Sequence, residues 1–200
     1  LELELGVLNG DKKGVTIKKK KAGEIDALSQ DAVKYQDIFK GKEVWAKPTS
    51  VYDGDTLTVN VMFPPVGVEL SDSEPIKQFL VSMKIRCDGY DTPEMKGKTK
   101  YEKQTAFIAK KAFERKIGFV SNKDIEANKP VLVQMKGLDK YGRLLAEVYI
   151  VNGREKQSMT TFMLDEHFAY SYGGATKDCD SFLEKYGKEI LSKKDALKFD

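Results

Sequence analysis

The sequence predicts an α+β or small-barrel domain, on three observations. Residues 44–63 and 76–86 contain runs that alternate apolar and polar side chains, as strands do. Residues 129–138 and 144–151 are two more strand patterns, and the segment DKYGR between them contains a turn glycine, which predicts a hairpin. Residues 101–117 place apolar side chains at helical spacing. Strands and helices do not alternate in βαβ order, so a doubly wound fold is not supported.

The first half of the chain begins with a charged, weakly patterned segment, residues 1–43, which contains one candidate helix at 25–39. In the strand region 44–63, an Asp-Gly dipeptide precedes the run LTVNVMF and predicts a turn or a bulge. Residues 64–75 are rich in proline, serine and acidic side chains, which is typical of a loop. The strand at 76–86 follows.

Three helices are expected in the second half. In the first, at 101–117, four apolar residues face inward and leave the lysines outside: Ala106, Ala109, Phe113 and Ile117. Ser158 is a candidate N-cap for a short helix that turns three apolar residues inward, Met159, Phe162 and Met163. Residues 168–174 are expected to be extended or turning, and 179–199 predict a last helix.

Composition allows one globular domain with extensions, since 40% of the 200 residues are apolar. No apolar run approaches the roughly 18–20 residues that span a bilayer, and no signal-peptide core is visible, so no membrane partner is expected. The visible chain leaves secreted and intracellular locations open. Cys87 and Cys179 lack metal-ligand spacing, and either free thiols or one disulfide would explain them.

A single histidine, His167, excludes zinc sites built on paired histidines. Hydrolytic chemistry would therefore depend on carboxylates, arginines and a hard metal ion. The net charge is +3, but residues 95–116 carry eight Lys/Arg against two Glu, a local charge of +6, and residues 17–23 add a second basic run. Such runs indicate either a solvated face or a surface for a polyanion.

Two acidic motifs, DGDT and DTPE, supply Asp53, Asp55, Asp91 and Glu94. Hard cations such as Ca²⁺ prefer oxygen ligands from carboxylates, carbonyls and water. Pro93 favours an extended Thr92, whose carbonyl could then face such a site. Two ordinary polar turns are the alternative.

Two arginines lie at strand ends, Arg86 and Arg143. The planar guanidinium fork matches phosphate oxygens and keeps its charge, although either arginine could also be an ordinary surface residue. Tyr141 follows Lys140 in the hairpin, and Tyr170 and Tyr172 alternate near the end of the core. These tyrosines suit bases stacked on rings, with core packing as the competing explanation.

The order of these motifs resembles the staphylococcal nuclease (thermonuclease) family over residues 44–174. DGDT comes first, then Arg86, four residues and DTPE, then a Lys-rich helix, DKYGR and Tyr-x-Tyr. The spacing R-x4-D-T-P-E followed by D-K-Y-G-R-x-L-A-x-V-Y is specific. The resemblance implies a five-stranded OB-fold barrel with about three helices, which agrees with the strands and helices predicted above.

The resemblance also implies roles for individual residues. Asp55 and Asp91 would bind Ca²⁺ through carboxylates and Thr92 through its carbonyl, with Asp53 in the outer shell. Glu94 would activate or position a water molecule. The other residues would contact the substrate. Arg86 and Arg143 would bind the scissile phosphate, and Lys140 and Tyr141 would contact a terminal phosphate. Tyr170 and Tyr172 would flank the base.

The function implied is a Ca²⁺-dependent nuclease that cleaves DNA and RNA with little sequence preference, favours single strands and leaves 3′-phosphate ends. A monomer is expected. The alternative is a non-catalytic OB-type module that binds nucleic acid or protein. The domains expected are an N-terminal extension (1–43), the nuclease-like domain (44–174) and a helical C-terminal extension (175–200).

The chain departs from the compact bacterial pattern at two places. Residues 62–78 are longer than in that pattern and could extend a hairpin, cover the groove or bind a partner. Asp88 and Gly89 replace aliphatic residues, which affects only the expected packing of the local strand.

Overall fold

A computed structural model describes residues 40–63, 79–174 and 178–195. These residues belong to one compact unit. The candidate helix at 25–39, the basic run at 17–23 and the loop at 64–75 lie outside the described residues. None of the described helices is long and apolar enough to span a membrane.

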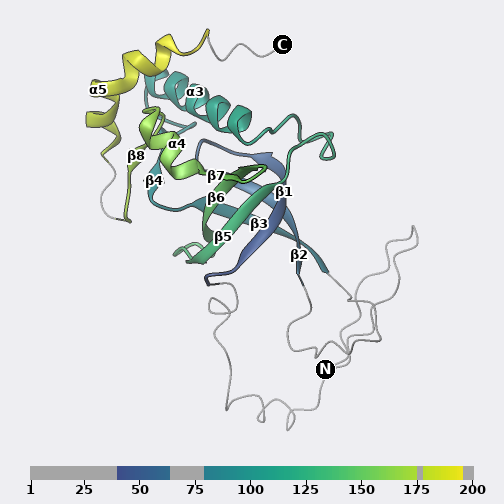
Figure 1. The fold of residues 1–200 in the computed structure, drawn as a ribbon. Coiled ribbons are helices and arrows are strands. Elements are labelled where there is room, and N and C mark those ends of the chain that lie inside the picture. The colour runs from purple at the N-terminus through teal and green to yellow at the C-terminus, as the bar shows by residue number, and fades with distance from the viewer. Residues whose placement is uncertain (1–39, 64–78, 175–177, 196–200) are drawn as a thin grey trace, which may run out of the picture. The chain divides into compact units, whose positions relative to one another are not determined.

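Five strands close into a barrel: β1 Glu43–Val51, β2 Thr56–Phe63, β3 Phe79–Cys87, β5 Val131–Leu138 and β6 Leu144–Asn152 (Figure 1). Their order is β3-β2-β1-β5-β6, and β3 pairs with β6 in parallel, Ile85 opposite Leu144, which joins the two edges. The other pairs are antiparallel. The predicted five-stranded barrel and the hairpin at DKYGR are confirmed.

Alternation along the strands produces the core. Every second side chain turns inward, because successive residues of a strand face opposite sides of the sheet. Along most of β2, β5 and β6 the inward residues are buried: Leu57, Val59, Val61, Val131, Val133, Met135, Leu144, Ala146 and Val148. β7, Glu155–Ser158, extends the sheet beside β6 and was not predicted, since its first three side chains are polar and exposed.

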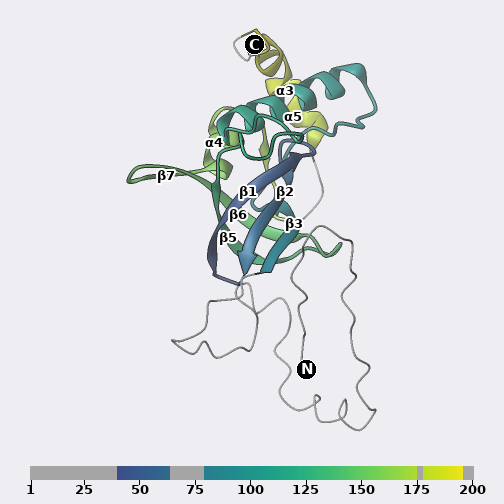
Figure 2. The ribbon, with the colours of Figure 1, turned by 90° about the vertical axis from the view of Figure 1, so that its right-hand side faces the viewer.

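Three helices, all predicted, gather at one end of the barrel in both views (Figures 1 and 2). They are α3 Lys100–Lys116, α4 Met159–Asp165 and α5 Cys179–Ser192, and each starts at a side-chain cap, Thr99, Ser158 and Asp178. The four apolar residues predicted to face inward on α3 are at most 2% exposed. In α4, Met159 and Met163 are buried, while Phe162 is half-buried.

α5 packs against α3 at a close approach. A Cβ at Gly187 would collide with the Tyr101 ring, so this position requires glycine for the two helices to approach this closely. α5 ends at Ser192, earlier than the predicted helix at 179–199. Lys193 instead turns toward α4 and donates to the Glu166 carbonyl at 2.6 Å.

Two short strands form a second sheet beside the barrel, β4 Tyr90–Asp91 and β8 Tyr170–Ser171. Asp91 pairs with Tyr170 in this ladder. Both cysteines are thiols rather than a disulfide. Burial raises the pKa of Cys87, so its thiol stays protonated and behaves as a core residue.

Candidate functional site

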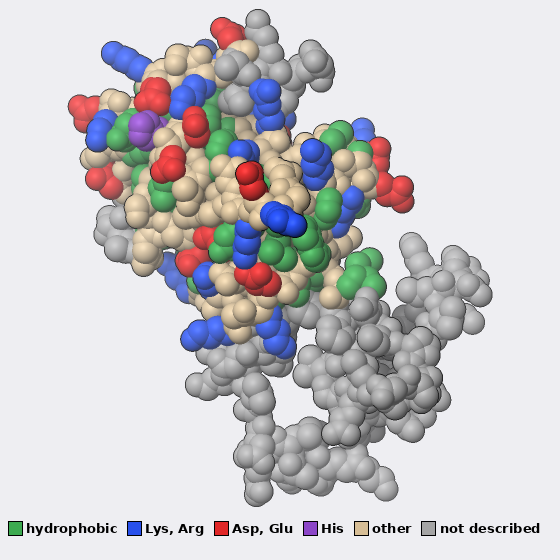
Figure 3. Space-filling model, viewed as in Figure 1, with side chains coloured by type: hydrophobic (Ala, Val, Ile, Leu, Met, Phe, Trp, Pro, Cys, Tyr) green, Lys and Arg blue, Asp and Glu red, His purple; other side chains and the backbone are tan. Residues whose placement is uncertain are grey.

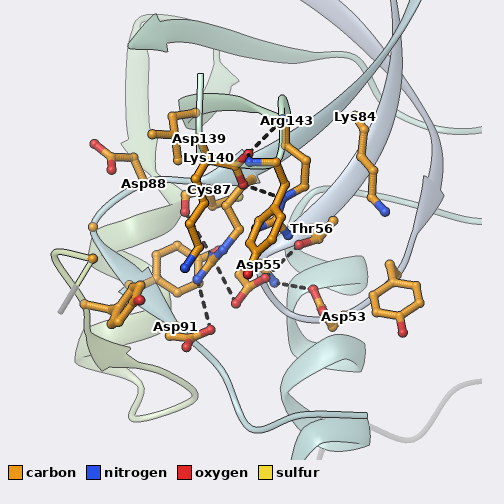
Figure 4. A pocket seen from close by; sticks show the side chains of 18 of the residues that line it. Asp53, Asp55, Thr56, Lys84, Cys87, Asp88, Asp91, Asp139, Lys140 and Arg143 are labelled. Atoms are coloured by element: carbon orange, nitrogen blue, oxygen red, sulfur yellow. Dashed lines mark hydrogen bonds and ion pairs between the residues drawn. The ribbon is translucent and has the colours of Figure 1, made fainter. Parts of the chain in front are cut away.

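A cavity of about 860 Å³ opens where the β1–β2 turn, β3, the segment after β4 and the β5–β6 hairpin meet (Figure 4). Nine of the predicted site residues line it: Asp53, Asp55, Arg86, Asp91, Glu94, Lys140, Tyr141, Arg143 and Tyr172. Two others, Thr92 and Tyr170, are not part of the lining. Segments far apart in the sequence therefore converge as the motif order suggested.

The β1–β2 turn fixes the first carboxylate. Tyr52 donates its backbone N–H to the Thr56 carbonyl at 2.9 Å, which closes the turn. The Asp53 side chain accepts from the Asp55 N–H at 3.2 Å. A Cβ at Gly54 would lie 2.8 Å from Thr92 Cγ2, so only glycine lets this turn approach DTPE so closely.

Arg86 lies between the two predicted metal carboxylates. Its Nη1 is 2.9 Å from Asp55 Oδ2, and its Nη2 is 2.9 Å from Asp91 Oδ1. Burial alone would lower the pKa of Arg86, but the two carboxylates outweigh it and raise the pKa. The guanidinium is therefore held in place as a permanent cation.

Asp55 carries a buried charge that its neighbours compensate only in part. Burial and the nearby Asp53 raise the pKa of Asp55 well above its usual value, and Arg86 opposes this. Thr56 Oγ1 donates to Asp55 Oδ1 at 2.8 Å, which fixes the carboxylate. A further cation at this carboxylate would be electrostatically favourable.

Thr92 connects the carboxylates of Asp55 and Asp91. Its backbone N–H lies 3.2 Å from Asp55 Oδ2 and 3.1 Å from Asp91 Oδ1. Its hydroxyl also donates to Asp55 Oδ2, at 3.3 Å. Asp91 in addition accepts from the Tyr170 hydroxyl at 3.1 Å. Both carboxylates thus face one small region.

Within the described residues, no group of three or more acidic, histidine or cysteine side chains gathers that could hold a metal ion by itself. The ligand set of two carboxylates and one carbonyl therefore stays a prediction. Its oxygen donors fit a hard cation that keeps several waters.

Asp139 positions the second arginine and was missed by the sequence analysis. Its carboxylate accepts from the Tyr141 and Arg143 N–H groups, both at 2.8 Å, and from Arg143 Nε at 2.5 Å. Burial acts to raise the pKa of Asp139, but these hydrogen bonds outweigh it and lower the pKa. An aspartate at the first position of a tight turn was the signal available in DKYGR.

The tyrosines take different positions. Tyr141 is 72% exposed, and Lys140 Nζ lies 5.1 Å from its ring centroid. Tyr172 lines the cavity, whereas Tyr170 packs against Phe182 with ring centroids 5.2 Å apart and is absent from the lining. Burial, followed by the charge of Asp91, raises the pKa of Tyr170, so its hydroxyl remains a donor.

The predicted catalytic carboxylate, Glu94, is exposed and borders the cavity from the segment after β4. The basic segment that follows it is partly neutralised within its own helix. Lys111 lies 2.7 Å and Lys110 3.7 Å from Glu114 carboxylate oxygens. Figure 3 shows basic and acidic side chains interspersed over the described part of the face that it draws.

The comparisons with known proteins agree with this geometry. Residues 84–196, more than half of the chain, match the model of the staphylococcal nuclease homologue family. The match includes α5 and begins inside β3, although β1 and β2 complete the same barrel. A search of curated proteins found no match. With the barrel closed and the family's motifs gathered around one cavity, the chain belongs to the staphylococcal nuclease family.

Proposed function

We propose that this protein is a Ca²⁺-dependent nuclease that hydrolyses phosphodiester bonds of DNA and RNA with low sequence specificity and leaves 3′-phosphate ends. One observation carries the proposal: Arg86 contacts Asp55 and Asp91, each at 2.9 Å, in a cavity that Glu94 and Arg143 also line. This set combines oxygen ligands, phosphate-binding cations and a carboxylate that can accept a proton.

The cation would be held by the carboxylates of Asp55 and Asp91 and the carbonyl of Thr92, with water completing its shell. The raised pKa of Asp55, caused by burial and by Asp53, supports this assignment because an added positive charge would stabilise the carboxylate. When bound, Ca²⁺ would neutralise phosphate charge and polarise a water molecule.

Arg86 and Arg143 would bind the scissile phosphate. Each is held before substrate arrives, Arg86 by the carboxylates of Asp55 and Asp91 and Arg143 by that of Asp139. Because little reorganisation is needed, the two guanidiniums can stabilise the extra negative charge of five-coordinate phosphorus more than the ground state. A preorganised donor of this type contributes about 3 kcal/mol to transition-state stabilisation.

Glu94 would accept or direct the proton of the attacking water as the new oxygen–phosphorus bond forms. The bond between phosphorus and the 5′ oxygen breaks, that oxygen takes a proton from solvent, and Glu94 releases to solvent the proton that it accepted. Arg143 would reduce the negative charge on the departing oxygen. The products are one 3′-phosphate end and one 5′-hydroxyl end.

Low sequence specificity is expected, because phosphate contacts and ring stacking carry little information about base identity. The exposed Tyr141 and the cavity-lining Tyr172 are available for stacking. Stacking needs an unpaired base, which favours single strands.

The test is cleavage of a labelled single-stranded oligonucleotide with Ca²⁺ and with excess chelator. We expect cleavage only with Ca²⁺, and a fall in kcat of about a hundredfold or more for Glu94→Gln while binding is retained. Glu155→Gln is the matched control, since Glu155 is exposed on β7 and does not line the cavity. Cleavage that persists in chelator would exclude the metal role.

The second candidate is a module that binds nucleic acid without cleaving it, since members of a fold family need not share an activity. The ion pairs that hold Arg86 would serve phosphate binding equally well. This function is indicated if the wild-type protein binds the oligonucleotide, leaves it intact with Ca²⁺, and Glu94→Gln changes nothing.

A further inference from the structure

A second tyrosine–lysine pair borders the same cavity, and neither residue belongs to the predicted site. Tyr52 and Lys84 both line it, and Lys84 Nζ lies 5.5 Å from the Tyr52 ring centroid. Tyr52 is 49% exposed. Its backbone is fixed, because its N–H donates to the Thr56 carbonyl at 2.9 Å and closes the β1–β2 turn.

The sheet topology places Tyr52 and the Lys140–Tyr141 pair on opposite flanks of β3, the strand that carries both Lys84 and Arg86. β3 carries Arg86, which pairs with Thr56 of β2 on one side and with Leu145 of β6 on the other. Tyr52 precedes β2, whereas the hairpin containing Tyr141 precedes β6. In Figure 4, Lys84 and Asp53 lie at one end of the cavity and Asp88 and Asp91 at the other, with Asp55 between them.

The two pairs have similar chemistry. In each, a lysine ammonium lies over an exposed tyrosine ring, at 5.5 Å for Tyr52 and 5.1 Å for Tyr141. An exposed ring beside a cation suits a base stacked on the ring with its phosphate neutralised alongside. A single strand whose phosphate lies at Arg86 carries one nucleotide toward each flank.

We propose that Tyr52 and Lys84 form a second nucleotide subsite, on the opposite side of the scissile phosphate from Lys140 and Tyr141. The inference rests on the proposed nuclease function and adds the substrate class: a single strand with a base on both sides of the bond that is cut. Tyr52 stacks on one of these bases, and Lys84 neutralises the next phosphate on that side.

The test uses a dinucleotide with a 3′-phosphate, d(TpTp), which has one cleavable internal bond, and two versions in which hydrogen replaces one thymine or the other. In the wild-type protein each missing base should lower kcat/KM about tenfold. With Tyr52→Ala, one of the two substrates that lack a thymine should have the same kcat/KM as d(TpTp), while the other should keep its tenfold deficit. With Tyr52→Phe, both substrates should keep the deficit. Tyr172→Ala is the matched variant, because Tyr172 lines the cavity and donates its N–H to the Gly89 carbonyl at 3.0 Å, and it should erase the other penalty.

A purely structural role for Tyr52 would lower kcat/KM for all three substrates by the same factor and leave both penalties in place, which would overturn the proposal. Lys84→Gln gives an independent measurement on a longer oligonucleotide. Because this variant loses one phosphate contact, the slope of the logarithm of the binding constant against the logarithm of the salt concentration should fall in magnitude by about one. An unchanged slope would remove Lys84 from the subsite.

If the wild-type protein cleaves none of the substrates, the nuclease function fails and the subsite is tested by binding. The three dinucleotides then compete against a fluorescent thymidine oligomer. If Tyr52→Ala no longer distinguishes one of the base-lacking dinucleotides from d(TpTp) in affinity, the subsite is supported without catalysis. The proposal would be overturned if the variant and the wild type lose the same affinity for each missing base, or if the wild type does not bind.

Discussion

Arg86 Nη1 lies 2.9 Å from Asp55 Oδ2, and both side chains are buried at the cavity wall. The oxygen that pairs with this guanidinium is also one that the proposed Ca²⁺ would approach. Arg86 and the cation therefore compete in part for the same negative charge. This competition has a measurable consequence for stability.

Arg86→Gln should destabilise the metal-free protein by about 3 kcal/mol, because it removes the guanidinium that pairs with the buried carboxylates of Asp55 and Asp91. Ca²⁺ should then raise the melting temperature of the variant more than that of the wild type, since no guanidinium opposes binding. Ligand at a hundredfold excess over Kd adds about 2.7 kcal/mol. Thermal unfolding with Ca²⁺ and with chelator measures both effects.

The matched control is Arg154→Gln, because Arg154 is exposed in the β6–β7 turn and does not line the cavity. It should melt within a degree or two of the wild type in both buffers. An equal Ca²⁺ response in wild type and Arg86→Gln would contradict a shared carboxylate site.

Asp139→Ala should lower kcat/KM about tenfold, because the carboxylate that holds the Arg143 Nε at 2.5 Å is lost. Because Asp139 acts through Arg143, adding Asp139→Ala to the Arg143→Ala variant should lower kcat/KM only slightly further. Kinetics of the two single variants and the double variant provide the coupling energy. Asp124→Ala is the control: Asp124 also accepts a backbone N–H, from Ala127 at 3.2 Å, but lies outside the cavity lining.

Cys179 should react slowly with iodoacetamide in the folded protein. Burial, followed by the charge of Glu102, raises the pKa of its thiol from 9.0 to about 12. The thiolate is the reactive form, so alkylation near pH 8 should be about a hundredfold or more slower than in denaturant. The contribution of the protonated thiol to the free energy of unfolding is fully present below pH 9 and is lost as the pH rises toward 12.

Alkylation followed by mass spectrometry of the two cysteine peptides gives the rates. Cys87 is the internal comparison, because it is 2% exposed and should react only through unfolding. Equal rates for Cys179 in the folded and denatured protein would show that its environment does not protect the thiol.

Much of the barrel could be predicted from the sequence because β2, β5 and β6 alternate apolar and polar side chains along most of their length. The β5–β6 hairpin followed from DKYGR, where Gly142 takes φ 77° at the turn. β7 was missed because its side chains are polar, although Gly153, with φ 62° in the β6–β7 turn, is a hairpin signal. Apolar periodicity does not detect a strand that buries almost nothing.

For the site, the sequence motifs predicted the residues that they contain but not the residues that tertiary contacts add to them. The family order places Asp55 and Asp91 together, and the structure brings both within 2.9 Å of Arg86. The contributions of Tyr52 and Lys84 depend on which strands flank β3, and this pairing is not readable from local spacing. Tertiary contacts also decide which tyrosine of the Tyr-x-Tyr pair lines the cavity, because Phe182 of α5 covers Tyr170.

Tyr170 offers the sharpest distinction between a base-binding and a positioning role. Its hydroxyl donates to Asp91 Oδ2 at 3.1 Å. Tyr170→Phe removes this bond and keeps the ring, so it should raise the Ca²⁺ concentration for half-maximal rate about tenfold. At saturating Ca²⁺, KM for an oligonucleotide should stay within about twofold, because the ring is retained. Tyr149→Phe is the matched control, since its hydroxyl donates to Gln134 at 3.3 Å outside the cavity lining. An unchanged Ca²⁺ dependence would mean that Tyr170 does not orient Asp91 for the metal.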